Sequence, residues 1–186
     1  QPHPPLYMAA GTERSIGYAA AHGMGLMLST LPGFETLAGQ IDFYRSRMAD
    51  APAPWNGNPA FGQVDIARWV YVAESDAKAK DDSAEGIVRH ISAFMGKATA
   101  GYLGSVSEKG GDELDYDELA ATTLLHGSPD TVIRRLKELQ AATGLSSLVL
   151  HYPPYYGPEK SLKMLRLFAK EVLPEFQGEV ASSAAD

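Results

Sequence analysis

Short apolar runs alternate with longer amphipathic segments along this chain of 186 residues. The amphipathic segments carry apolar residues at intervals of three and four, a spacing that predicts helices. These segments are 13–22, 34–48, 76–100, 129–143 and 162–172. The apolar runs are short enough to be strands buried on both faces. These runs are 6–9, 24–28, 66–73 and 148–150. Because strands that alternate with helices form parallel sheets, the sequence predicts an α/β fold with about four parallel strands.

Two positions carry clear signals for the start of a helix. Thr12 can accept a hydrogen bond from the first helical turn, as an N-cap residue does. Ser128 has the same role before Pro129, whose fixed backbone angle suits the first position of a helix. Pro174 is predicted to end the last helix, because proline cannot continue the hydrogen-bonded turn.

This pattern fits two architectures. A complete (β/α)8 barrel typically needs about 250 residues, so the chain would supply half of one. An open, flavodoxin-like sheet of four strands would fit 186 residues without strain. The alternation of elements by itself does not separate the two folds.

Composition narrows the classes of partner. The 16 lysine and arginine residues are scattered through a chain of net charge −7, so we expect no nucleic-acid partner. No apolar run is long enough to span a membrane, so we expect no membrane partner. Cysteine is absent and the histidines lack metal-ligand spacing, which predicts a cytoplasmic protein without a metal. Since the chain begins at Gln1 and not at methionine, we also expect a segment upstream.

Four blocks of sequence resemble one family of flavin enzymes. The blocks are PPLYMAAGTERS (4–15), RWVYVAESDA (68–77), HGSPDTV (126–132) and LVLHY (148–152). In this order and spacing they resemble the fifth strand, the seventh strand, a helix start and the eighth strand of the luciferase-like monooxygenases. That barrel family includes bacterial luciferase and alkanesulfonate monooxygenase. The resemblance implies the C-terminal half of a TIM (β/α)8 barrel over residues 1–178.

The same resemblance implies a function and partners. The enzyme would use reduced FMN and O2 to oxygenate a small organic substrate. A flavin reductase is a further partner that the resemblance implies. The N-terminal half of the barrel would complete the site, so the fragment alone is expected to be inactive and to form a homo-oligomer, a dimer in the simplest case. Three alternatives stay open: an F420-dependent oxidoreductase of the same family, a phosphate-binding lyase or isomerase using Glu74, and a non-catalytic assembly piece.

The resemblance also implies a cofactor site. The flavin phosphate would lie on Ala10, Gly11 and Thr12, where Gly11 replaces one of two hydroxyl residues in the family pattern. A helix N-terminus attracts anions through its unpaired N–H groups and its dipole. Arg14 could neutralise phosphate charge. A plain helix cap without a ligand is the alternative interpretation of the same residues.

Aromatic residues after the last strand are candidates to contact the substrate or the flavin ring. They are His151, Tyr152 and Tyr155, and catalytic loops of barrels gather after strand ends. A proline-rich loop with aromatic packing is the alternative. His126 is predicted to be structural. The glycine-rich segment 101–114 is predicted to be either a lid over flavin and substrate or a surface loop, and the small, polar residues 179–186 a flexible tail.

Overall fold

The computed structural model describes residues 4–53, 55–94 and 114–177. Within these ranges five strands belong to one sheet, in the order β1-β2-β3-β4, and β5 also pairs with β3. The pairings of β1 with β2, β2 with β3 and β3 with β4 are parallel. The α/β class with parallel strands is therefore confirmed, and the structure adds one strand, β4, that the sequence does not predict.

The chain folds as two compact units. Unit 1 contains Gln1–Arg68 and Leu139–Leu150, and unit 2 contains Trp69–Glu138 and His151–Asp186. The boundary falls inside β3 (Val64–Val72) and inside α6 (Pro129–Thr143), so both elements contribute residues to each unit.

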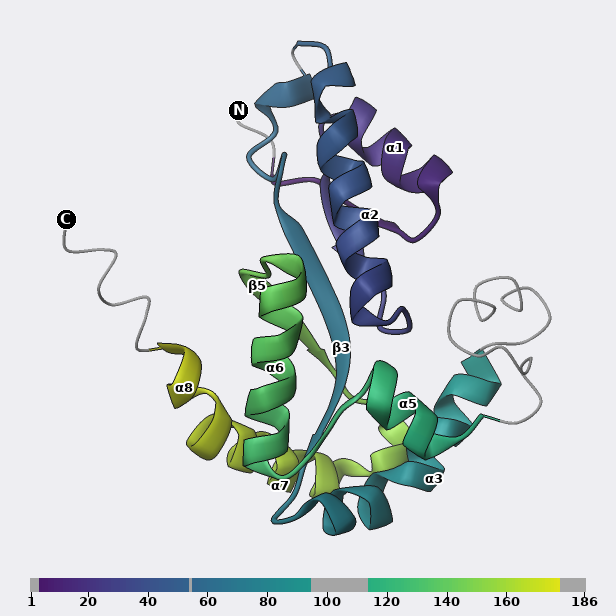
Figure 1. The fold of residues 1–186 in the computed structure, drawn as a ribbon, viewed down its shortest axis with the longest axis vertical. Helices are drawn as coiled ribbons and strands as arrows, with labels where there is room; N and C mark the ends of the chain where they lie inside the picture. Colours follow the sequence, from purple (N-terminus) through teal and green to yellow (C-terminus); the bar gives the residue numbers. More distant parts are fainter. Residues whose placement is uncertain (1–3, 54, 95–113, 178–186) are drawn as a thin grey trace. The chain divides into compact units, whose positions relative to one another are not determined.

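Unit 1 has two strands followed by helices, as the sequence predicts. Its first elements are β1 (Tyr7–Ala10), α1 (Glu13–Ala21), β2 (Gly25–Leu28) and α2 (Phe34–Arg47). Short 3-10 turns follow at Met48–Asp50 and Trp55–Gly57, and β5 spans Ser147–His151. Helices α1 and α2 pack side by side (Figure 1).

The core of unit 1 lies between its strands and these two helices. Its buried members come from the apolar stripes that predict the helices and from the strands between them. They are Ala10, Ile16, Ala19, Ala20, Leu26, Leu28, Leu37, Ile41, Tyr44, Ile66 and Leu139. Burying each large aliphatic side chain contributes about 1.5–3 kcal/mol, so this cluster is the main source of stability in unit 1.

Two buried polar side chains fix the loops of unit 1. The Arg68 guanidinium donates to the carbonyl oxygens of Ser29 at 3.0 Å and Pro32 at 2.7 Å, which holds the turn between β2 and α2. The Asn58 amide donates to the carbonyl oxygens of Leu6 at 2.9 Å and Gly23 at 2.8 Å. Because buried polar groups require partners, these contacts set the loop positions.

Unit 2 contains the remaining helices. They are α3 (Asp76–Phe94), α5 (Tyr116–Thr122), a 3-10 turn at Pro154–Tyr156 called η3, α7 (Pro158–Leu167) and α8 (Pro174–Gln177), with β4 at Leu125–Gly127. The chain continues from α7 through a π-helical stretch, Phe168–Val172. This helical run ends at Val172 with Leu173 as its C-cap, so the predicted stop before Pro174 is confirmed. Pro174 then begins α8, a short helix that the sequence does not predict, because a helix tolerates proline in its first turn.

Two predicted mobile segments lie outside the described residues. They are the tail 179–186 and the segment 101–114, predicted to be either a lid or a surface loop, of which the structure describes Leu114 alone. Among the helices that are described, none combines the length and apolar character needed to cross a membrane.

Candidate functional site

The turn between β1 and α1 in unit 1 holds two hydroxyl groups together. Thr12 has an extended backbone, and its Oγ1 accepts from the backbone N–H of Ser15 at 3.3 Å. Ser15 Oγ accepts in return from the backbone N–H of Thr12 at 3.1 Å. The two hydroxyl oxygens are 2.9 Å apart. This reciprocal arrangement is a capping box, so the predicted role of Thr12 as N-cap is confirmed.

Ser15 is the residue that the sequence interpretation of this site missed. The hydroxyl absent at Gly11 has a counterpart one helical turn later, beside Thr12. The pattern Thr-x-x-Ser at a helix start is the signal that could have identified it. The Gly11 carbonyl also accepts from the Gln40 amide at 2.9 Å, which ties the turn to α2. Hydrogen bonds within the protein therefore hold this turn.

The other predicted cofactor residues lie around this turn in different environments. Ala10 is buried in the core of unit 1, so its backbone alone is available to a ligand. Arg14 is exposed in the first turn of α1, next to Glu13. The backbone N–H groups of Glu13 and Arg14 occupy the first two helical positions, which lack an intrahelical acceptor in any α-helix.

In unit 2, two of the three predicted substrate residues join an aromatic cluster. His151 stacks on Trp69 with ring centroids 6.3 Å apart and planes inclined by 19°. The His90 ring centroid is 6.1 Å from that of His151 and 5.9 Å from that of Tyr155. The Arg89 guanidinium carbon lies over the Tyr155 ring, 5.1 Å from its centroid. Trp69 and His90 are far from residue 151 in sequence, so only the fold reveals this cluster.

Burial shapes the chemistry of the aromatic cluster. The Trp69 side chain is 3% exposed, and its Nε1 has no hydrogen-bond partner within the described part of the chain. Burial, and then the charge of His151, lowers the pKa of His90 below its usual value. The third predicted residue, Tyr152, is exposed, and no ring contact joins it to the cluster in the described residues.

His126 lies at the centre of a buried polar network in unit 2. Its Nδ1 is 3.0 Å from Ser83 Oγ, and its Nε2 is 3.0 Å from the Tyr156 hydroxyl. Because Ser83 Oγ already donates to the Ala79 carbonyl, Nδ1–H donates to Ser83 and Nε2 accepts from Tyr156. Burial lowers the pKa of His126 to about 3, so its imidazole is neutral at pH 7. This geometry agrees with the structural role expected of His126.

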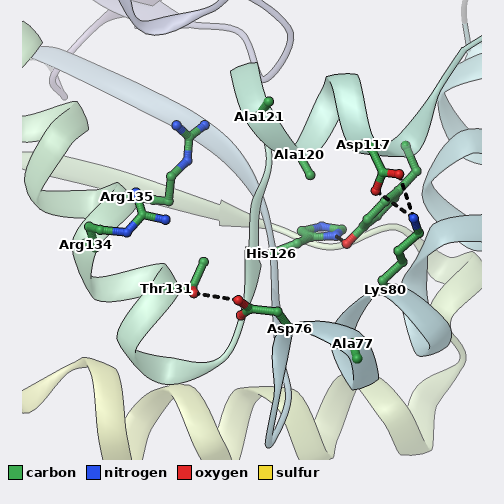
Figure 2. A pocket seen from close by; sticks show the side chains of 11 residues that line it. Asp76, Ala77, Lys80, Asp117, Ala120, Ala121, His126, Thr131, Arg134 and Arg135 are labelled. Atoms are coloured by element: carbon green, nitrogen blue, oxygen red, sulfur yellow. Dashed lines mark hydrogen bonds and ion pairs between the residues drawn. The ribbon is translucent and has the colours of Figure 1, made fainter.

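A pocket of about 450 Å³ lies beside this network, between α3, α5 and α6 (Figure 2). Its walls carry charged, aromatic and small side chains. They are Asp76, Ala77, Lys80, Tyr116, Asp117, Ala120, Ala121, His126, Thr131, Arg134 and Arg135. No local sequence pattern identifies this set, because its members come from four segments that only the fold brings together.

The start of α6 forms one edge of the pocket. Asp76 accepts from the backbone N–H of Ser128 at 2.7 Å and from the Thr131 hydroxyl at 3.0 Å. The bond from Ser128 is the main reason why the pKa of Asp76 is lowered. Gly127 has φ of +151°, and a Cβ there would lie 2.7 Å from the Asp76 carboxylate. Glycine at position 127 therefore permits the Asp76 carboxylate to lie close to the backbone at the start of α6.

Within the described ranges, no group of three or more histidine, aspartate or glutamate side chains is placed to hold a metal ion.

Solved structures of similar fold include monooxygenases and an F420-dependent reductase. The chain is 21% identical to the oxygenating constituent of 3,6-diketocamphane monooxygenase from Pseudomonas putida in complex with FMN, with a TM-score of 0.66. It is 23% identical to a monooxygenase from Streptomyces bottropensis, with a TM-score of 0.67. It is 20% identical to the coenzyme F420 dependent tetrahydromethanopterin reductase from Methanopyrus kandleri, with a TM-score of 0.61.

These matches cover most of this chain and about half of each solved structure. The covered shares are 92% and 48% for the first structure, 95% and 49% for the second, and 93% and 51% for the third. The chain thus spans about half the length of the structures it matches. No curated protein sequence matches it.

Sequence provides the family assignment. The model of the luciferase-like monooxygenase family matches residues 1–146, which is well over half of the chain. Three of the four sequence blocks lie within the matched residues, the predicted family is confirmed, and this chain belongs to the luciferase-like monooxygenase family.

Proposed function

We propose that this chain is part of a monooxygenase that uses reduced FMN and O2 to oxygenate an organic substrate. Membership of the luciferase-like monooxygenases supports the reaction class, and one structure of similar fold is an FMN complex. The bound flavin would supply the oxygen-transfer chemistry, and the protein would position it and exclude water. The observation that carries the proposal is the Thr12 and Ser15 hydroxyl pair at the N-terminus of α1.

The turn between β1 and α1 fits a phosphate group. The Thr12 and Ser15 hydroxyls would donate to the phosphate by giving up bonds within the turn, since Ser15 Oγ donates to the Thr12 carbonyl at 3.0 Å and the two hydroxyl oxygens are 2.9 Å apart. The backbone N–H groups of Glu13 and Arg14 lie at the positive end of the helix dipole. The Arg14 side chain would offset the charge of the Glu13 carboxylate. Because Gly11 and Thr12 N–H groups already donate to Ser15 Oγ, at 3.4 and 3.1 Å, the hydroxyls and the next two N–H groups are the better donors for phosphate.

The aromatic cluster of unit 2 suits an organic substrate. His151 and Tyr155 are exposed and offer ring faces against which an apolar or planar molecule can pack, while the buried Trp69 stacks on His151. Burial lowers the pKa of His90, which favours an uncharged imidazole beside these rings. Tyr152, being exposed, would contact substrate at the margin of this cluster.

An F420-dependent oxidoreductase is the second candidate, supported by the similar fold of the F420 dependent reductase. A lyase or isomerase that uses Glu74 as an acid is less well supported. The Lys163 ammonium pairs with the Glu74 carboxylate at 2.6 Å and lowers its pKa, which opposes proton donation at neutral pH. Titration with FMN and with F420 would separate the first two candidates, since the tighter ligand identifies the cofactor.

Other partners follow from the same proposal. Because the chain spans about half the length of similar solved structures, the first half of a barrel would complete the flavin and substrate sites. A flavin reductase would supply the reduced cofactor. We expect the reductase and the first half of the barrel to act with this chain in the cytoplasm.

Replacing Thr12 by glutamate should abolish the preference of this chain for FMN over riboflavin. The new carboxylate would set negative charge against the phosphate at the end of α1, and we expect FMN affinity to fall about 10-fold or more. Riboflavin lacks the phosphate, so its affinity should change little. Quenching of flavin fluorescence during titration measures both affinities.

Two matched variants control this experiment. Thr12→Ser keeps the hydroxyl and should bind FMN like the unaltered chain. Thr122→Glu adds the same charge at the end of α5 and should also have no effect. If the unaltered chain bound FMN and riboflavin equally, or if Thr12→Glu kept the FMN preference, the phosphate would not be bound by this turn.

A further inference from the structure

We propose that the aromatic cluster of unit 2 takes an aromatic carboxylate as its substrate, with Arg89 pairing with the carboxylate group. This inference rests on the proposed function, which assigns an organic substrate to the exposed rings of His151 and Tyr155, and it adds the charge of that substrate. Ring faces accept neutral and charged aromatic molecules alike, so a charged group beside the rings sets the preference between them.

The Arg89 guanidinium lies beside the cluster without a carboxylate partner in the described part of the chain. Its central carbon lies over the Tyr155 ring, 5.1 Å from the centroid. Among the described residues no ion pair includes Arg89, and Glu85, one helical turn earlier on α3, lies beyond ion-pair distance from it. Contact with the face of a ring uses none of the N–H donors of a guanidinium. Arg89 therefore keeps its donors for a ligand.

Close packing of η3 against α3 fixes the place where Arg89 and Tyr155 meet. A Cβ at Gly86 would lie 3.2 Å from the Tyr155 carbonyl oxygen and 3.1 Å from the Tyr156 ring, so glycine permits this approach. The Tyr156 hydroxyl lies 3.0 Å from Nε2 of the buried His126, which holds η3 in place. Because the helix and the turn are already packed together, a ligand does not have to order them, which lowers the entropic cost of binding.

One guanidinium matches a ligand with one negative charge. Burial lowers the pKa of His90 and favours its uncharged form, so Arg89 is the permanent positive charge of this cluster. A carboxylate carries one negative charge, and its two oxygens match the paired donors of a guanidinium. A phosphate monoester carries a charge of about −1.5 to −2 at pH 7, more than one guanidinium neutralises. The carboxylate is therefore the better match.

The exposed rings provide a surface for the aromatic body of the ligand. The ring centroids of His151 and Tyr155 lie 6.1 and 5.9 Å from that of His90, so the two exposed rings flank the same half-buried imidazole. The buried Trp69 stacks on His151 and supports it. A planar ring that packs along these side chains can place a carboxylate on its edge at Arg89, which contacts Tyr155.

Titration of the 186-residue chain with three benzene derivatives tests this assignment, with the NMR signals of the His151 and Tyr155 rings as the readout. Benzoate is an anion, benzyl alcohol is neutral and benzylamine is a cation, and the ring is the same in all three. We expect benzoate to bind about 3-fold tighter than the alcohol, and the alcohol about 3-fold tighter than the amine. These differences are modest because Arg89 is exposed, and added salt should narrow them.

Variants locate the charge that is responsible. Arg89→Gln should remove the differences among the three probes, and Arg89→Glu should reverse their order. Because Arg89 is exposed, both variants are expected to fold. Arg166→Gln also removes an exposed positive charge, from α7, and should keep the order of the unaltered chain. His151→Ala removes an exposed ring and should weaken all three probes alike.

The outcomes separate this inference from the proposed function. Equal affinities for benzoate and benzyl alcohol would leave the rings as a substrate site and overturn the preference for an anion. Failure of all three probes to bind would overturn both. Equal effects of Arg89→Gln and Arg166→Gln would show that net charge, and not Arg89, is responsible, and would overturn the assignment of Arg89.

Discussion

Lowering the pH from 7 to 5 should reduce the free energy of unfolding of this chain by about 2 kcal/mol more than in a His126→Gln variant. The folded protein holds His126 neutral, with its pKa lowered by burial to about 3. In the unfolded chain the imidazole takes up a proton below about pH 6.5. Between about 6.5 and 3 the unfolded state therefore binds more protons, so stability falls as the pH falls through this window.

Urea unfolding of both proteins at pH 7, 6 and 5 measures this difference. The charged groups that share the pocket with His126 are Asp76, Lys80, Asp117, Arg134 and Arg135, and all are present in both proteins. Their contributions therefore cancel in the comparison. Equal slopes for the unaltered chain and His126→Gln would show that His126 is not held neutral.

The His126 network also connects several elements of unit 2. Ser83 belongs to α3, Tyr116 to α5 and Tyr156 to η3, and each hydroxyl lies within 3.3 Å of an imidazole nitrogen. One side chain in β4 thus connects three other elements. Protonation would require one of these hydrogen bonds to reverse, which is why acid weakens the whole arrangement.

Helix boundaries were predictable where a local signal fixes them. Thr12 caps α1, and Gly23 follows its end with φ of +63°. A Cβ at Gly23 would lie 2.0 Å from the Trp55 carbonyl oxygen, so glycine is required there for space as well as for backbone angle. Ser128 caps α6 through its hydroxyl, 3.4 Å from the Thr131 N–H. These signals act within one helical turn and therefore appear in the sequence.

Short elements were not predictable from periodicity. Strand β4 has three residues and α5 has seven, too few for a pattern of apolar positions to develop. A local signal did exist for α5, since Asp115 accepts from the backbone N–H groups of Asp117 and Glu118 at 2.7 and 3.0 Å. Asparagine and aspartate are common N-cap residues, so this start could have been found. Strand β4 depends on pairing with β3, which only the fold reveals.

The candidate sites, like the helices and strands, were predictable only where the signal is local in the sequence. Thr12 lies in a local motif, and the family resemblance identified it. The cluster of Trp69, His90 and His151 joins three segments, and its ring contacts depend on how those segments pack. The pocket on α6 depends on three helices and β4, so its arginines looked like surface charges in the sequence.

The 186-residue chain by itself should form dimers or larger assemblies and show no turnover with reduced FMN. Among the described residues β1 pairs with β2 on one side, and its sequence YMAA contains neither charge nor proline. In β5 alternate side chains are exposed, and Val149 is 39% exposed. Strand edges of this kind pair with another chain unless a charge or a proline blunts them. Light scattering across a range of protein concentrations measures the association.

Lysine substitutions on both strands should favour the monomer. Ala9→Lys combined with Val149→Lys would add charge to β1 and β5, and both positions are exposed. Leu162→Lys serves as the control, because Leu162 is an exposed apolar residue on α7, 49% accessible, and its loss should not alter association if strand edges are responsible. A monomeric unaltered chain, or equal effects of the two changes, would contradict the edge argument.

Association by itself should not produce activity, since phosphate binding at Thr12 and Ser15 does not orient a reacting ring, and orientation accounts for much of a catalysed rate. Oxygenation by this chain alone would show that its own residues suffice.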